Sequence, residues 1–392
     1  MPDIPSPIMP LSQNFESLIS ELRAVQHEFE LPISRPEGSY FPDFLASKLD
    51  AYRAFCQEAL IEKLKATGIR PSGHGADLLN SMLSRLGTLI DGINAAVSLH
   101  YEGKLRQANE RFDEALASLN FISLTSVGSI QPGSEEFYRA REGGERRLTR
   151  KDIFHIPFQS RHLIATNRYS IPGLPALYLG NSTYVCWEEF TEPSIGTLNF
   201  SRFANTRPLN VVRIYRLADF LNSITENWMD NERGMDLLVR FVLLFPLSIA
   251  CTIKTLYPTG KFKAEYIVPQ LLLQYVTKHE EIDGIMFPST KVNYSSIRSV
   301  PAYNYVFPAR AVAPTGFCPV LSALFHLTEP TSLELERLIN HAAQDALGMN
   351  EWKQMESKTV TIVEGIDSPY PITAFGNIER VLRQRDMAAC PN

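Results

Sequence analysis

The feature that most constrains the fold is a change of hydrophobic pattern near residue 123. In residues 11–122, apolar residues recur at spacings of three and four, as in Phe15, Leu18, Ile19 and Leu22, which is typical of amphipathic helices. After residue 134 the pattern becomes short β-rich segments separated by Gly and Pro. The stretch 123–134 is rich in Ser, Gly and Pro and predicts a linker. We therefore expect a helical N-terminal domain over residues 1–130, serving as a scaffold or docking domain.

The second part, residues 136–317, predicts a domain of the α+β class. Its expected strands are 176–179, 211–213, 284–287 and 304–307, and its expected helices are 183–190, 236–244 and 266–279. Helices and strands alternate irregularly and no Gly-x-Gly-x-x-Gly turn follows a strand, so a doubly wound nucleotide-binding fold is disfavoured. Residues 318–392 are expected to form a C-terminal extension that packs on this domain, with a helix at 332–347, a strand at 359–363 and an amphipathic segment at 378–385.

Charge and cysteine content narrow the function classes. The formal net charge is -5, from 38 basic and 43 acidic residues, which argues against a general nucleic-acid-binding surface. Five widely spaced cysteines with no Cys-x-x-Cys predict neither a disulfide framework nor a zinc ribbon, and they fit a reducing compartment. The N-terminus has no signal-peptide pattern, and the longest uncharged apolar run, 241–253, is too short to span a bilayer. We therefore expect a cytoplasmic protein that does not bind a membrane.

Several catalytic motifs are absent from the sequence. It has no His-Glu-x-x-His, no Gly-x-Ser-x-Gly, no phosphate-binding lysine loop and no paired Cys/His spacing, so no metal site is expected. His155 and His162 lie seven positions apart across a loop that contains Pro157, which favours structural or surface histidines over metal ligands.

One segment concentrates residues that could do chemistry. Residues 161–190 join a charged loop, a Pro/Gly turn, a short strand and a helix whose cap is Asn181 or Ser182. Within it Arg168 precedes Tyr178 by ten residues, and Tyr178 precedes Glu189 by eleven. Much later, Asp283-Gly-Ile-Met-Phe-Pro-Ser289 predicts a strand that ends in a Pro-Ser turn. Each of these residues alone is typical of a surface or core position, and only their common order indicates a site.

This order resembles the RES domain, the NAD-degrading toxin family of RES-Xre toxin-antitoxin pairs. The resemblance covers residues 137–310 and is supported by Phe137-Tyr-Arg139-Ala, His155-Ile-Pro-Phe and Asn304-Tyr-Val-Phe307. It implies an ADP-ribosyltransferase-like fold with a mixed β-sheet core. The chain departs from compact members of the family at Arg168-Tyr-Ser170, where those members often have an aromatic residue and Asn after the arginine.

The resemblance carries the family's Arg, Tyr, Glu and Ser over to Arg168, Tyr178, Glu189 and Ser289. Glu188 is adjacent to Glu189, and because neighbouring helical residues point about 100° apart, only one of the two carboxylates can face a pocket. The spacing from Tyr178 favours Glu189, whereas helical periodicity leaves the choice open. Arg139 is a second candidate for contact with phosphate.

The implied substrate is NAD+, with no other cofactor. Nicotinamide leaves as a neutral base from a cationic glycoside, so the reaction requires no general acid and one carboxylate suffices to stabilise the oxocarbenium-like transition state. Arg168 suits the pyrophosphate, Tyr178 can border the nicotinamide ring, and Ser289 can hydrogen-bond the ribose or the amide.

Three functions remain open from the sequence. The first is an NAD+ glycohydrolase or phosphorylase that depletes cellular NAD+, as a toxin or defence effector. The second is an ADP-ribosyltransferase whose macromolecular target docks on the N-terminal domain. The third is an inactive RES-fold binding module. The resemblance also allows an antitoxin or immunity protein, and a second copy of the chain, as partners.

Overall fold

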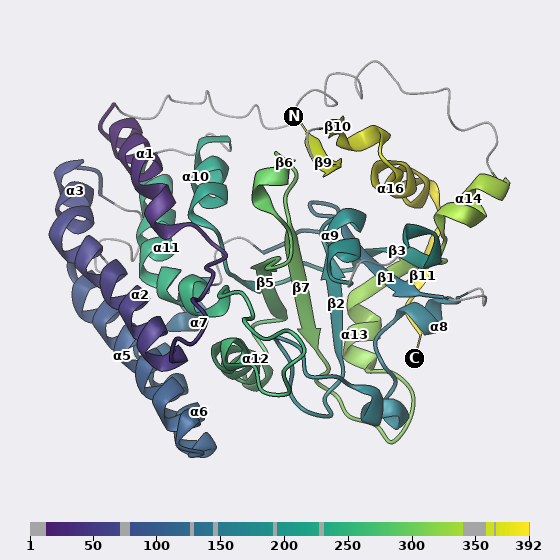
Figure 1. Cartoon of the computed structure of the whole chain (residues 1–392), viewed down its shortest axis with the longest axis horizontal. Coiled ribbons are helices and arrows are strands. Elements are labelled where there is room, and N and C mark those ends of the chain that lie inside the picture. Colours follow the sequence, from purple (N-terminus) through teal and green to yellow (C-terminus); the bar gives the residue numbers. More distant parts are fainter. Residues whose placement is uncertain are drawn as a thin grey trace, which may run out of the picture. The chain divides into compact units, whose positions relative to one another are not determined.

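The computed structural model (Figure 1) describes residues 13–70, 79–125, 129–143, 148–190, 194–226, 231–339, 358–363 and 366–391. It confirms the α+β class, because helices accompany a mixed β-sheet. The chain forms two compact units. One contains the described residues up to Thr125 together with Ile214–Tyr275, and the other contains those of Ser126–Arg213 and Val276–Asn392.

This division differs from the expected boundaries at 130, 136 and 317. Residues 214–275 group with the N-terminal helices and not with the sheet that precedes and follows them in sequence. The expected linker at 123–134 is partly ordered structure, since Ile130 pairs with Leu209 in an isolated antiparallel bridge and residues 126–128 lie outside the described residues. The physical reason is that an amphipathic helix packs on the apolar face that matches it, wherever that face lies in the sequence.

The first unit is helical. In its described part the α-helices are α1 (Gln13–Val25), α2 (Phe41–Phe55), α3 (Ile61–Ala66), α5 (Met82–Tyr101), α6 (Leu105–Ser118), α7 (Phe121–Thr125), α10 (Leu217–Glu226), α11 (Asn231–Cys251) and most of α12 (Ile267–Lys278). The expected periodicity of α1 is confirmed, because Phe15, Leu18, Ile19 and Leu22 are all buried. Helices α5 and α6 approach so closely that a Cβ at Gly92 would lie 2.3 Å from Cβ of Ala115.

Helix α11 is longer than the apolar run predicted. It begins at Asn231, before the expected start at 236, and continues through Pro246 to Cys251. The stretch Glu232–Cys251 is long and apolar enough to cross a membrane by length and composition, and 83% of its most apolar window is buried inside protein. A mostly buried apolar helix is typical of a core helix, and the Tyr52 hydroxyl donates a hydrogen bond to its Val242 carbonyl (2.8 Å).

The second unit is built on an eight-stranded sheet. Its order is β11-β8-β3-β1-β2-β7-β5-β4, and every neighbouring pair is antiparallel except β4 and β5. In chain order these strands are β1 (Phe137–Glu142), β2 (Ala176–Gly180), β3 (Leu198–Asn205), β4 (Val211–Arg213), β5 (Gly284–Pro288), β7 (Tyr303–Pro308), β8 (Phe325–Thr328) and β11 (Met387–Ala389). A smaller sheet has the order β10-β9-β6, with β6 (Ile297–Arg298), β9 (Thr359–Val363) and β10 (Ile366–Pro369).

All five expected strands are confirmed, as β2, β4, β5, β7 and β9. The α-helices described in this unit, apart from the end of α12, are α8 (Arg150–Ile153), α9 (Thr183–Glu188), α13 (Pro319–Leu324), α14 (Leu333–Ile339) and α16 (Ala374–Gln384). The expected helix at 332–347 corresponds to α14, and residues 340–347 lie outside the described residues. Across both units, short 3-10 or π-helical segments occur at Gln26–Phe29, Cys56–Leu60, Phe158–Leu163, Ile195–Thr197, Ala264–Tyr266, Tyr294–Ser296 and Tyr370–Ile372.

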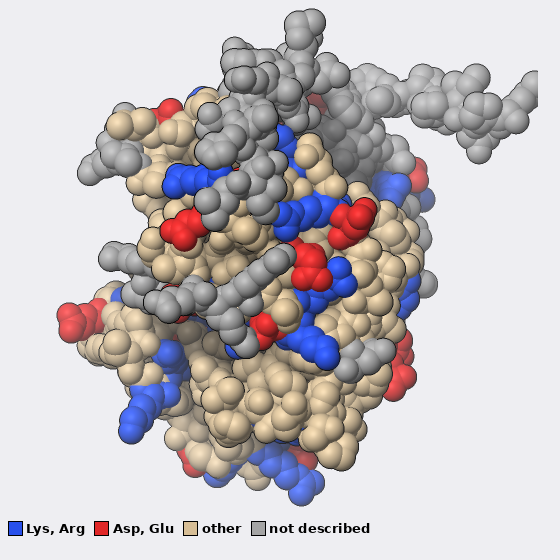
Figure 2. Space-filling view, turned by 90° about the vertical axis from the view of Figure 1, so that its right-hand side faces the viewer, with Lys and Arg blue, Asp and Glu red and all other residues tan. Residues whose placement is uncertain are grey.

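The C-terminal extension belongs to the second unit. Strands β8 and β11 continue the main sheet beyond β3, and α16 lies beside α9 in Figure 1. Figure 2 looks onto the side of this unit where α8 and α14 lie in Figure 1, and there Lys and Arg side chains have acidic side chains between them. Ion pairs between Arg150 and Glu329 (2.9 Å) and between Arg385 and Glu336 join elements of this region. Opposite charges in such proximity reduce the net potential of the face.

Candidate active site

The strand register gathers several candidate residues on one face of the main sheet. Tyr178 of β2 lies opposite Val306 of β7, and Asn304 of β7 lies opposite both Gly180 of β2 and Phe287 of β5. Directly opposite residues share a face, and so do residues two apart on one strand. Tyr178, Asn304 and Phe287 therefore lie on the same face. Gly180 keeps this part of the sheet close to α9, because a Cβ there would meet Sγ of Cys186 at 2.9 Å.

Helix α9 follows β2 after a two-residue turn. The Ser182 side chain caps the helix by accepting the N–H of Val185 (3.1 Å), and the helix ends at Glu188. Glu189 is therefore the C-terminal cap and not a residue inside the helix as expected, although its backbone keeps a helical conformation (φ -71°, ψ -16°). A short helix on a tight turn fixes where the next carboxylate leaves the backbone.

The Glu189 carboxylate is the centre of a polar cluster. Its Oε1 accepts hydrogen bonds from Ser289 Oγ (2.9 Å) and from Asn304 Nδ2 (2.6 Å). Lys291 Nζ lies 3.8 Å from Oε2 and donates a hydrogen bond to the Glu189 carbonyl. Hydrogen bonds to an ionised acceptor are stronger than neutral ones, so two of them on one oxygen orient the carboxylate. Its side chain is 38% exposed, which leaves it accessible to a ligand.

Both the backbone and the side chain of Ser289 are hydrogen-bonded. It follows β5, is fully buried, and its N–H donates to the Ala302 carbonyl (2.9 Å). Its hydroxyl oxygen accepts the N–H of Lys291 (3.3 Å), and the Tyr294 hydroxyl donates to its carbonyl (3.1 Å). The hydroxyl of Ser289 donates to Glu189 (2.9 Å), and its contact with the ribose or amide of a ligand stays a prediction.

Arg168 reaches the loop that carries Ser289. Its side chain is mostly buried, with the residue 8% exposed, and its Nη2 donates to Oγ1 of Thr290 (3.3 Å). The ring of the next residue, Tyr169, packs against that of Phe287 in β5, with ring centroids 4.3 Å apart and an interplanar angle of 36°. The Tyr178 hydroxyl donates to the carbonyl of Tyr169. These contacts attach the Arg168 loop to β2 and β5 and bring it to the same end of the sheet as Ser289.

Arg139 lies on β1 and is directed away from the Glu189 cluster. Its neighbour Tyr138 is opposite Gly180 and shares the face of the cluster, so alternation along β1 directs Arg139 to the other face. Its guanidinium donates to the Tyr178 carbonyl (2.9 Å), and burial together with Arg141 lowers the pKa of Arg139 to about 10. Arg139 thus contacts the backbone of β2 and not the Glu189 carboxylate, and its contact with phosphate stays a prediction.

The two adjacent carboxylates have different surroundings. Burial raises the pKa of Glu188, with the charge of Glu189 adding to the shift and a hydrogen bond with Tyr184 opposing it. Glu188 is thus directed to Tyr184 on its own helix, whereas Glu189 is directed to Ser289 and Asn304. Of the pair, Glu189 is the carboxylate that the structure joins to a residue carried over from the family.

Sequence reasoning missed Asn304, Thr290 and Lys291 as site residues. Asn304 was noted only as part of a closing motif, yet it is 7% exposed in a strand whose six residues are all buried. An amide in such a strand needs hydrogen-bond partners, and that requirement was a usable signal. Thr290 and Lys291 follow Ser289 directly, and nothing in their types distinguishes them from ordinary turn residues.

His155 has a structural environment. It is fully buried, with Nδ1 hydrogen-bonded to the Ile156 carbonyl (2.8 Å) and Nε2 accepting the N–H of Cys318 (2.9 Å). Burial lowers the pKa of His155 to about 4, so the ring is neutral near pH 7. Among the described residues, no group of three or more His, Cys, Asp or Glu side chains could hold a metal ion.

Comparison with known proteins gives one relationship. No family model matches the chain, and no solved structure matches it significantly. A protein of Bacillus subtilis (strain 168) with the name "Putative toxin YopC" is 30% identical over 367 residues, which cover 90% of this chain and 78% of that protein. A match over so much of the chain includes both compact units. The chain therefore belongs to the same family as YopC, a protein that is named as a toxin.

Proposed function

We propose that this chain is a toxin whose second unit is a RES-type domain that cleaves NAD+ into nicotinamide and an ADP-ribose product. The observation that carries the proposal is the Glu189 carboxylate, oriented by Ser289 and Asn304 at the end of the sheet reached by Arg168. Two further points support it: the order of Arg168, Tyr178, Glu189 and Ser289 resembles the RES family, and the relative YopC is named as a toxin.

The chemistry needs a single oriented anion. The bond between ribose C1′ and the nicotinamide nitrogen breaks, the electron pair stays with that nitrogen, and neutral nicotinamide departs. C1′ then carries oxocarbenium-like positive charge until an oxygen of water or phosphate bonds to it, and the acceptor's proton is released to solvent. Glu189 stabilises this charge. Ser289 and Asn304 both donate to its Oε1, and its Oε2, which lies 3.8 Å from Lys291 Nζ, can accept a ribose hydroxyl.

The surrounding residues suit the remainder of the substrate. Arg168 offers a planar set of donors that suits the pyrophosphate, and its Nη2 lies 3.3 Å from Oγ1 of Thr290, directly after Ser289. The Tyr178 hydroxyl is already engaged by the Tyr169 carbonyl, so the ring, not the hydroxyl, is the part of Tyr178 that can border nicotinamide.

The test is to incubate the purified chain with NAD+ in a buffer that contains inorganic phosphate and no other protein, and to measure released nicotinamide by chromatography, with Glu189→Gln as the inactive control. Release without any added target supports the proposal. Release only after addition of a cell lysate would support ADP-ribosyl transfer to a macromolecule instead. No release under either condition would refute an NAD+-cleaving function and favour a binding module.

A further inference from the structure

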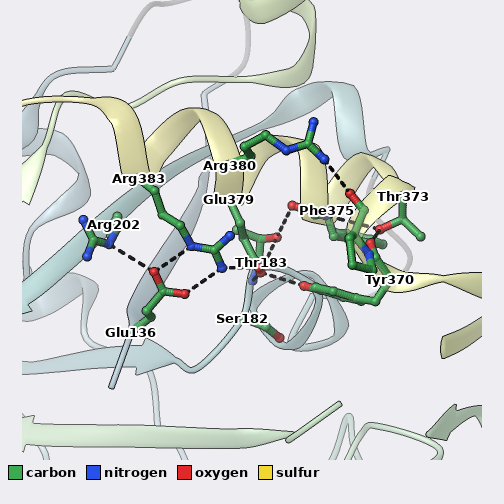
Figure 3. Close-up of polar contacts among 12 residues, drawn as sticks. Glu136, Ser182, Thr183, Arg202, Tyr370, Thr373, Phe375, Glu379, Arg380 and Arg383 are labelled. Carbon is green, nitrogen blue, oxygen red and sulfur yellow. Dashed lines mark hydrogen bonds and ion pairs between the residues drawn. The ribbon is translucent and has the colours of Figure 1, made fainter. Parts of the chain in front are cut away.

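The segment that holds α9 in place lies outside the part of the chain that resembles the RES domain. The resemblance ends at residue 310, whereas Tyr370 and the whole of α16 come later. Figure 3 shows side chains of α16 directed toward the start of α9 and toward Glu136, just before β1. The C-terminal extension is therefore in direct contact with the helix whose C-terminal cap is Glu189.

Glu379 of α16 makes the central contacts. Its Oε1 accepts hydrogen bonds from the backbone N–H of Thr183 (2.8 Å), from the Thr183 hydroxyl (3.2 Å) and from the Tyr370 hydroxyl (2.6 Å) (Figure 3). Thr183 is the first residue of α9, and its N–H has no partner within the helix. A buried carboxylate from a distant segment thus supplies the acceptor that the first turn of α9 lacks, while Ser182 supplies the acceptor for Val185.

Arg383 extends the connection to the sheet. Its Nε and Nη2 each donate to one oxygen of Glu136 at 2.7 Å, and Nη2 also lies 3.4 Å from Oε2 of Glu379. Glu136 in turn lies 3.5 Å from Nε of Arg202 in β3. The bidentate geometry fixes α16 relative to the strands as well as to α9.

Two apolar clusters also join the C-terminal extension to α9 and to neighbouring segments. One contains residues of α9, of the loop after Ser289 and of the C-terminal extension: Tyr184, Val185, Val292, Val300, Ala302, Val360, Tyr370 and Phe375. The other joins Tyr138 and Phe200 of the sheet to Cys186 of α9 and to Ile378 and Leu382 of α16. The extension therefore packs against both segments that converge on the Glu189 carboxylate, which are α9 and the loop that starts at Ser289.

We propose that Glu379 is a positioning residue for the candidate active site: it holds the first turn of α9, and so sets where Glu189 meets Ser289 and Asn304. This inference rests on the proposed function. It assigns to the C-terminal extension a role in the chemistry of the RES-like domain without contact with substrate. A misplacement of about 1 Å at a reacting group can cost about 100-fold in rate, so loss of the contact is expected to lower kcat more than affinity.

The experiment compares three variants of the full chain. Glu379→Ala removes the acceptor. Glu379→Gln keeps an oxygen that can accept the N–H of Thr183. Arg380→Ala is the matched control, because the Arg380 guanidinium on the same helix donates to the Pro371 carbonyl (3.0 Å), within the extension itself.

The readouts are kcat and KM for nicotinamide release and the emission of Trp187, recorded in a background with Trp228→Phe and Trp352→Phe. Trp187 is in α9 and packs against Phe375 of α16, with ring centroids 5.6 Å apart, so its emission reports whether α9 keeps its contact with the extension. We expect Glu379→Ala to lower kcat about 100-fold with KM for NAD+ within about threefold, and to shift Trp187 emission. Glu379→Gln is expected to keep the parental kcat and Trp187 emission, and Arg380→Ala is expected to change neither of these readouts.

The results test the positioning role of Glu379 separately from the proposed function. If the parent chain releases nicotinamide and Glu379→Ala keeps the parental kcat, the positioning role is overturned while the proposed function stands. Equal losses in all three variants would also overturn it, because they would indicate general loss of packing. A parent chain that releases no nicotinamide would overturn the proposed function and this inference with it. If Glu379→Ala does not fold, Glu379→Met takes its place, because it fills a similar volume without an acceptor for the Thr183 N–H, and an unchanged kcat in that folded variant would overturn the inference.

Discussion

Replacement of Glu189 by Gln tests the candidate site most directly. The change keeps the shape of the side chain, and the remaining carbonyl oxygen can still accept from Ser289 and Asn304, which donate to Oε1 at 2.9 and 2.6 Å. What is lost is the negative charge that stabilises positive charge at C1′ in the proposed reaction. Removal of one such electrostatic stabiliser costs about 2.7–4 kcal/mol, so kcat is expected to fall about 10²–10³-fold.

Glu189→Gln is expected to change the free energy of unfolding only slightly. The charge of Glu189 also pairs with Lys291, but their side chains are 38% and 47% exposed and the ion pair spans 3.8 Å, so solvent screens it. Loss of an exposed pair of this kind changes the free energy of unfolding by about 0–1 kcal/mol. Chemical unfolding followed by circular dichroism should therefore give nearly the same midpoint for Glu189→Gln and the parent.

The assay is nicotinamide release at saturating NAD+, with Glu188→Gln as the matched control. Glu188 is hydrogen-bonded to Tyr184 and not to Ser289 or Asn304, so its variant is expected to keep activity within about threefold, less than the effect of one ordinary hydrogen bond. An inactive Glu188→Gln beside an active Glu189→Gln would show that the wrong carboxylate has been chosen. Full activity in both variants would refute the site.

The remaining predictions concern affinity, orientation and pH. Arg168→Lys should weaken NAD+ binding by about tenfold or more, because an ammonium cannot replace the planar fork at a pyrophosphate; unchanged affinity by calorimetry would return Arg168 to a structural role. Asn304→Ala should lower kcat roughly 10- to 100-fold, and the double variant with Glu189→Gln should be no worse than Glu189→Gln alone, since both changes act through one carboxylate; kinetics of the two single variants and the double variant check this. His155 has its pKa lowered by burial from 6.5 to about 4, so the folded chain binds fewer protons than the unfolded chain between these values. The contribution of neutral His155 to the free energy of unfolding is therefore complete above pH 6.5 and falls by roughly 3 kcal/mol as the pH drops to about 4. Urea unfolding at several pH values should show this decrease, and His155→Gln should make it smaller.

Short apolar strands were predictable because their signal is local. The expected strands at 284–287 and 304–307 are fully buried in the structure, and runs of β-branched and aromatic residues between turns predict such strands. The strands β1 and β3 were missed because charged residues interrupt the pattern, as Arg202 does within β3. Strand β11 has three residues, Met387–Ala389, and is defined by its pairing with β8, which no local pattern encodes.

The division into units was not predictable from local pattern. Helix α11 has an apolar face that could pack against any matching surface, and its place in the helical unit depends on contacts far away in sequence, such as the hydrogen bond from Tyr52 to Val242. This has a practical consequence for truncation. A fragment beginning near residue 136, which the sequence suggested as a folded domain, would keep residues 214–275 without the helices they group with. Its exposed apolar surface would favour aggregation.

The candidate site divides in the same way between local and distant determinants. Local sequence predicts that a carboxylate follows a short helix after β2 and that Ser289 follows a buried strand, since each depends on one turn. Which of Glu188 and Glu189 meets Ser289 depends on where α9 ends and how it is rotated on the sheet. The rotation is constrained by contacts 196 residues away in sequence, through Glu379 and Thr183. On the proposals made above, a motif names the type of residue that does the chemistry, and the extension beyond the motif contributes to where that residue points.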